Sequence, residues 1–209
     1  GFDGDLDTAS EASDATYRQL TTQWLTDAAK EVINILPSEL KIECATITSL
    51  TSTTPMDLDA TGEVFHVTRE NADNGYHIGC REVNPIFAGS AGDSTSLHYV
   101  TATDPIYWVE SDTGGDPKLF VKPDPTANQP ARVHHVAFPT VEYNHTAIVN
   151  FPDEAEYLVV LRAAITSSEY LLAIEEDIEL YASVLTTLKA QYQEGVYTLQ
   201  SGQFSPQKK

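Results

Sequence analysis

Residues 153–193, DEAEYLVVLRAAITSSEYLLAIEEDIELYASVLTTLKAQYQ, hold the most regular apolar pattern of the chain. Apolar and small side chains recur there in alternating steps of three and four residues, at Tyr157, Val160, Ala164, Ser167, Leu171, Ile174, Ile178, Tyr181, Leu185, Leu188 and Tyr192. This alternation is the heptad repeat of helices that pack along a narrow seam. It predicts one long helix or two stacked helices, and the weak position Ser167 makes residues 166–168 the expected place for a break.

The seam has two candidate partners. One is the first helix of the same chain, since such a seam is most often an internal packing surface. The other is a neighbouring copy of the chain in a ring. Residues 154–165 favour the neighbouring copy, because a helix that is apolar nearly all round needs more than one partner. The seam residues other than Ser167 are therefore the predicted oligomer or bundle interface.

The ends of this helical region carry recognisable signals. Residues 150–154, NFPDE, combine a polar cap, a proline suited to the first turn, and acids at the positive end of the helix dipole. Gly195 ends the apolar pattern, so the helical region is predicted to span residues 150–195. The remaining residues 196–209 read as a polar C-terminal arm, which is disordered or docks on a partner through Val196, Tyr197, Leu199 and Phe204.

The first part of the chain predicts another helix. Residues 1–12 form an acidic lead, and residues 13–37 follow with apolar side chains at a period near 3.6, at Tyr17, Leu20, Trp24, Ala28, Val32 and Ile35. Pro37 ends this helix, because the residue before a proline is disfavoured in the helical conformation.

The middle of the chain, residues 38–149, predicts strands. Short β-branched or aromatic runs at 64–67, 76–78, 106–109, 119–121 and 133–136 alternate with turns rich in glycine, proline and aspartate. The predicted fold class is therefore α+β. An N-terminal helix and long, heptad-patterned C-terminal helices form a bundle, and a β-sandwich or barrel-like insertion lies between them.

The charge of the chain limits its partners. Asp and Glu number 31 against 12 Lys and Arg, which gives a formal net charge of −19. Sequence-independent DNA binding requires basic side chains that contact phosphates, so this chain is not expected to bind DNA in that way. DNA could instead slide past such an acidic surface. No apolar run approaches the roughly 20 residues needed to cross a bilayer. The first residues lack the basic and apolar regions of a secretory signal, so a cytoplasmic origin and reduced cysteines are expected.

The histidines do not have the spacing of a catalytic or metal site. His134 and His135 are adjacent on a predicted strand, so their side chains point to opposite faces. The others, His66, His77, His98 and His145, lie on separate strands or turns.

Two further motifs fail on detail. Asp3, Asp5 and Asp7 resemble the start of a calcium loop, but Thr8 stands at the glycine position and Asp14 at the glutamate position. Residues 89–92, GSAG, lack the nucleophile-elbow pattern. The sequence therefore predicts no catalytic residue, no cofactor and no metal.

Two stretches carry a resemblance to a known family. Residues 28–37, AAKEVINILP, and residues 151–165, FPDEAEYLVVLRAAI, resemble helices of virion proteins of marine and cyanobacterial phages. Together with the order of helix, β-rich insertion, helix and C-terminal arm, they make the chain similar to the head-to-tail adaptor (connector, or head completion) proteins of tailed bacteriophages.

The resemblance implies a place in the virion. Such adaptors form twelve-fold homo-oligomeric rings in the neck of the particle, and they are made in the host cytoplasm. The arm at 196–209 would bind the portal protein, the helices would form the ring wall, and the β insertion would face a tail or nozzle protein. DNA would pass through the acidic lumen without specific binding.

Two other classes of function stay open. A capsid decoration protein or a tail-terminator subunit would also use an acidic, β-rich domain. A hydrolase with its site among the histidines of the β-rich domain is the enzymatic alternative, although no triad, metal pair or phosphate loop is visible in the sequence.

Overall fold

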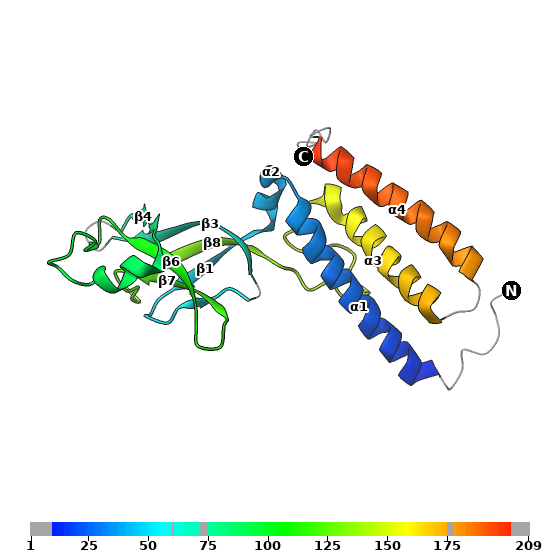
Figure 1. Cartoon of the computed structure of the whole chain (residues 1–209), viewed down its shortest axis with the longest axis horizontal. Coiled ribbons are helices and arrows are strands. Elements are labelled where there is room, and N and C mark those ends of the chain that lie inside the picture. Colours follow the sequence, from blue (N-terminus) through cyan, green and yellow to red (C-terminus); the bar gives the residue numbers. More distant parts are fainter. Residues whose placement is uncertain (1–9, 60, 72–74, 175–177, 202–209) are drawn as a thin grey trace. The chain divides into compact units, whose positions relative to one another are not determined.

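The computed structural model describes residues 10–59, 61–71, 75–174 and 178–201 (Figure 1). The chain divides into two compact units. The first, here called the helical unit, contains residues 1–44 and 138–209, and the second, the β unit, contains residues 45–137. The boundaries of the β unit lie inside the predicted insertion 38–149, because residues 138–152 pack with the helices.

The helical unit is a layer in which one helix lies between two others. Its elements are α1 (Ser10–Ile35), α2 (Ser38–Lys41), a 3₁₀ turn η1 (Ile42–Cys44), α3 (Asp153–Ile174) and α4 (Ile178–Gln200). α3 packs against α1 on one side and against α4 on the other (Figure 1). α3 and α4 are antiparallel, and Lys189 of α4 forms a 2.8 Å ion pair with Glu169 of α3.

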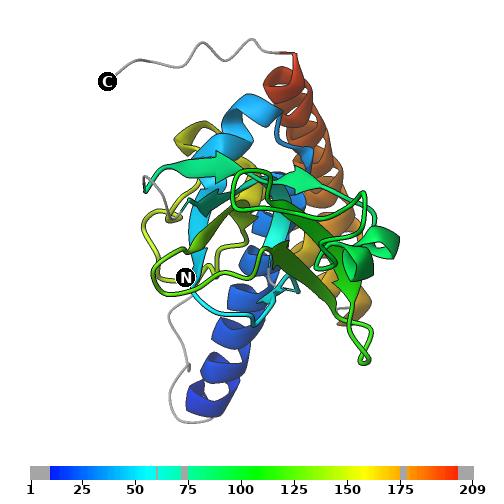
Figure 2. The same cartoon turned by 90° about the vertical axis from the view of Figure 1, so that its left-hand side faces the viewer.

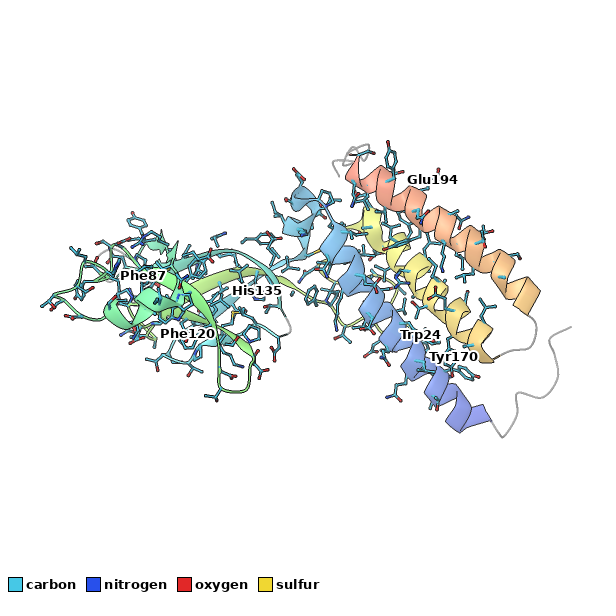
Figure 3. All side chains as sticks on the ribbon, viewed as in Figure 1. Trp24, Phe87, Phe120, His135, Tyr170 and Glu194 are labelled. Carbon is cyan, nitrogen blue, oxygen red and sulfur yellow. The ribbon has the colours of Figure 1, made fainter. Side chains whose placement is uncertain are left out.

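α1 buries the face predicted from its apolar spacing only in its second half. Ala28, Ala29, Val32 and Ile33 are all nearly inaccessible to solvent, whereas Tyr17 is 54% exposed. One helical turn before Ala28, Trp24 packs its ring against Tyr170 of α3 at a centroid distance of 5.5 Å (Figure 3). The helix ends at Ile35, two residues before Pro37, as the geometry of a pre-proline residue requires.

The segment between the β unit and α3 is anchored on α1. Val141 is buried, and its backbone N–H donates to the Thr26 hydroxyl at 3.1 Å. The same hydroxyl donates to the Val141 carbonyl at 3.4 Å. Residues 138–149 therefore belong to the helical unit rather than to the β insertion in which the sequence places them.

The prediction of a long, heptad-patterned C-terminal bundle is wrong. The region folds as two separate helices of 22 and 23 residues that lie side by side. On α3 the most deeply buried side chains are Ala155, Leu158 and Val159, while the seam residues Tyr157 and Val160 are 40% and 60% exposed. The heptad pattern therefore does not describe one continuous packing seam.

The break expected at residues 166–168 is also absent, since α3 continues through them to Ile174. The Thr166 hydroxyl donates to the carbonyl of Arg162 at 3.2 Å, and the Ser168 hydroxyl donates to the carbonyl of Ala164 at 2.8 Å. These bonds satisfy the hydroxyls inside the helix, so the polar run is accommodated without a turn.

Gly195 does not end the last helix, because α4 continues to Gln200. A Cβ atom at this position would lie 2.6 Å from Leu158 Cδ2 and 2.7 Å from Tyr157 Oη. Those distances are shorter than a normal van der Waals contact, so the glycine permits the close approach of α4 to α3.

We predict that Gly195→Ala destabilises the helical unit by about 1–3 kcal/mol, as overpacking does. An alanine would otherwise favour the helix by about 1 kcal/mol. The free energy of unfolding, measured by urea titration with helical circular dichroism, checks the sign. In a Leu158→Ala background the penalty should shrink, because the crowded methyl group is gone. A more stable Gly195→Ala protein would contradict the close-packing role.

The described residues of the β unit form two four-stranded sheets (Figure 2). The first has the order β1-β8-β3-β4, with the strands β1 (Ala45–Leu50), β8 (Ala131–Ala137), β3 (Thr61–Glu70) and β4 (His77–Gly79). The second has the order β2-β7-β6-β5, with the strands β2 (Met56–Asp57), β7 (Pro117–Lys122), β6 (Ile106–Ser111) and β5 (Arg81–Glu82). Neighbouring strands are antiparallel except for the β5–β6 pair.

One apolar cluster joins the two sheets. Val67, Ala131 and Val133 come from the first sheet, and Met56, Leu119 and Val121 come from the second. A smaller cluster of Ala91, Val100, Ile106 and Trp108 lies where residues 83–105, including the 3₁₀ helix η2 (Pro85–Ser90), pack on the second sheet. The class of the protein is therefore α+β, with a two-sheet β unit that has a core of its own.

Candidate assembly surface

An open groove runs between α3 and α4 at the end where α3 begins. It has a volume of about 650 Å³ and is lined by Tyr157, Val160, Leu161, Gln191, Glu194, Gly195 and Thr198. Glu194 lies on α4 beside this groove (Figure 3). Gly195 marks the part of this lining where α4 touches α3, since a Cβ atom there would overlap Leu158 and Tyr157.

Exposed apolar side chains lie in this groove and along the two helices. Val160 is 60% and Tyr157 is 40% exposed, and on α4 Val184 and Tyr197 are 43% and 73% exposed. Partial burial, together with the carboxylate of Glu194, raises the pKa of the Tyr157 phenol, so the hydroxyl stays protonated and able to donate. The groove thus offers apolar contact area together with the polar side chains of Gln191, Glu194 and Thr198.

The structure distributes the predicted interface residues over different environments. On α3, Tyr157 and Val160 reach the groove, while Ala164 and Leu171 are half-buried. On α4, Leu185, Leu188 and Tyr192 are half-buried and share the helix face of Gly195, which touches α3. The side chains of Ile174, Ile178 and Tyr181 lie outside the described residues.

The predicted arm residues are placed differently from the prediction. Val196, Tyr197 and Leu199 belong to α4, and Leu199 is only 4% exposed. A buried leucine cannot dock on a partner while α4 stays folded, so of these three Tyr197 is the most available. Phe204 lies outside the described residues.

Sequence reasoning missed the α4 side of the groove. Gln191, Glu194 and Thr198 line it together with Tyr157, although they lie more than thirty residues farther along the chain. Only the antiparallel packing of α3 and α4 brings these positions together. A signal was present in Gly195, since a glycine within a helix often marks a close approach.

Polar contacts bind α3 to its neighbour α1. Arg162 of α3 contacts both carboxylate oxygens of Glu31, through Nε and, at 3.1 Å, through Nη2. Its hydrogen bond to Glu31 raises the pKa of Arg162 further above its already high value. This two-pronged geometry fixes the orientation of the pair as well as its distance.

The histidines of the β unit serve different local contacts. His66 of β3 and His134 of β8 stack with ring centroids 3.9 Å apart and an interplanar angle of 20°. His135 is buried, and its Nε2 lies 2.9 Å from the Thr48 hydroxyl. His98 packs its ring on Phe87 at 4.5 Å. Within the described ranges, no group of three or more His, Cys, Asp or Glu side chains is arranged to hold a metal ion.

We predict that the β unit loses stability as the pH falls below about 6.5, the ordinary histidine pKa. Partial burial, the neighbouring His66 and Arg132 lower the pKa of His134 in the folded state. The unfolded chain therefore binds this proton more readily, which favours unfolding at acidic pH. Thermal unfolding between pH 8 and pH 5 measures the effect. His134→Gln should flatten the profile, and an unchanged pH dependence in this variant would contradict the role of His134.

The two cysteines are free thiols. Burial, and to a lesser extent Glu43, raises the pKa of Cys44 to about 11. Burial raises the pKa of Cys80 to about 12. Both groups are therefore protonated at neutral pH and poor nucleophiles.

We expect neither native thiol to react with a disulfide reagent such as DTNB at pH 8 within minutes. The same protein in guanidinium chloride should release reporter from both cysteines, which provides the control. Rapid reaction of the folded chain would show that at least one thiolate is accessible.

No described helix is both long enough and apolar enough to span a membrane. Comparison of the chain with protein-family models and with curated proteins gives no match.

Proposed function

We propose that this chain is a virion structural protein without enzymatic activity, which forms the ring-shaped head-to-tail adaptor of a tailed phage. The observation that carries the proposal is the α3–α4 groove with its exposed Tyr157 and Val160. Exposed apolar side chains gathered in one recess are typical of a surface that another protein covers.

The helical layer suits repetition around a ring. α3 is covered from both sides by α1 and α4, whereas the outer sides of those two helices lack a further described helix of the same unit. If the groove of one copy receives a different surface of the next, the contact is heterologous, and such contacts close into a ring when the rotation permits. Ring closure would then cover Val160.

The charge of the chain supports a passage for DNA. A net charge of −19 repels phosphates, so a lumen formed by this protein would let DNA pass without binding it. In this proposal Tyr197 and the residues beyond α4 contact the portal, and the β unit contacts the tail or nozzle protein.

We predict that the purified full-length protein forms rings at high concentration and that Val160→Asp abolishes them. The new carboxylate would be placed in an apolar contact without a partner, which is costly on burial. Native mass spectrometry and negative-stain electron microscopy measure the assembly state.

Val149→Asp is the matched control, because Val149 is 77% exposed and lies outside α3 and α4. It should assemble as the unmodified chain does, and both variants should keep the same circular dichroism spectrum. Rings that persist in Val160→Asp would argue against the groove as the contact between copies.

A further inference from the structure

The two sheets of the β unit end in strands of very different length and charge. Among the described strands, three of the four outermost ones are short: β4 has three residues, and β2 and β5 have two each. β2 and β5 also carry charges, namely Asp57, Arg81 and Glu82. Short strands and charged side chains are the usual protection of a sheet edge against pairing with another chain.

The remaining edge strand, β1, has neither protection. It is six residues long, with the sequence ATITSL, and pairs with β8 along its whole length. It contains no charge and no proline, and three of its residues are β-branched. Since β1 ends the sheet order, no described strand takes up the backbone groups on its other side. These groups form a template for an added strand.

Ile47 adds an apolar contact to this edge. It is paired with His134 of β8 near the middle of β1, and its side chain is 56% exposed. Ser49, which points to the same face of the sheet, is also exposed. A strand placed beside β1 could therefore cover an isoleucine that β8 leaves open.

The charge pattern indicates what that strand can be. Two copies of a chain with a net charge of −19 repel each other over most of their surfaces. Between Glu43 and Asp57, however, no residue is charged, and β1 lies in this interval. It is therefore a place where two identical chains can approach without like charges meeting.

We propose that β1 pairs in antiparallel fashion with β1 of a second copy, with Ile47 opposite Ile47 of the second copy. This two-fold contact joins the two four-stranded sheets into one continuous sheet. Opposed residues in antiparallel strands point to the same face, so this register brings the two exposed isoleucines together as a cross-strand pair. The contact uses the β unit, whereas the proposed ring uses the helical unit. A two-fold contact cannot lie within a ring of equivalent copies, so in solution it would join two such rings, and in the particle the tail protein would take its place on the β unit.

A disulfide tests the register directly. Opposed residues of antiparallel strands have Cα atoms about 4.5–5.5 Å apart, within the range that a disulfide spans. Ile47→Cys should therefore form a disulfide-linked dimer under mild oxidation at neutral pH, seen on a non-reducing gel. Ser49→Cys is the matched control, because its two copies would lie about 13 Å apart along the strands. Cys44 and Cys80 are present in both variants.

The mass of the protein in solution tests the contact without cross-linking. Analytical ultracentrifugation should show that Ile47→Lys halves the mass of the species formed by the unmodified chain. Leu97→Lys makes the same kind of change at a fully exposed apolar residue away from β1 and should leave the mass unchanged.

Three results would overturn the pairing: equal cross-linking of the two cysteine variants, no cross-linking of either, or equal mass for Ile47→Lys and the unmodified chain. Failure of the ring has a different signature. Val160→Asp would then leave assembly unchanged, while the disulfide of Ile47→Cys would still form.

Discussion

The organisation of the helical unit depends on the need to cover α3. Its residues 154–165 are apolar on almost every side, so a single neighbouring helix cannot remove them from water. α1 covers one side of α3, and its Ala28, Ala29, Val32 and Ile33 are buried. α4 covers another side. α4 therefore supplies, within the same chain, the second partner that the apolar pattern demands.

The close approach of α4 has a consequence for the surface. Gly195 lets α4 come within contact of Leu158, and Tyr157 and Val160 line the groove beside this contact. The proposed assembly uses the groove beside this contact as a docking surface.

The start of α3, the end of α1 and the strand-rich middle were predictable from the sequence, because proline, caps and β-branched runs act locally. The fold of the C-terminal region was not. Its three-four spacing continues from Leu171 to Tyr181 without a glycine or proline to signal that the chain turns back. Gly195 has the signature of a helix end in the sequence, since glycine most often follows a helix, but here it packs inside one.

Only part of the candidate groove could be predicted from the sequence. Tyr157 and Val160 could be chosen from spacing alone, whereas their α4 partners could not, because only the antiparallel arrangement defines them. For the β unit, strand content was predictable but sheet order was not. The unprotected edge of β1 is visible only once β1, β2, β4 and β5 are known to be the outer strands.

The central claim is that many copies of this chain meet through their helical units in the neck of a phage particle. A cryo-electron microscopy reconstruction of the intact particle, with the chain located by its fold, tests it most directly. The account predicts a single twelve-fold ring between portal and tail, with Val160 covered by the neighbouring copy. Hundreds of copies spread over the capsid surface, or a neck ring in which Val160 faces solvent, would contradict it.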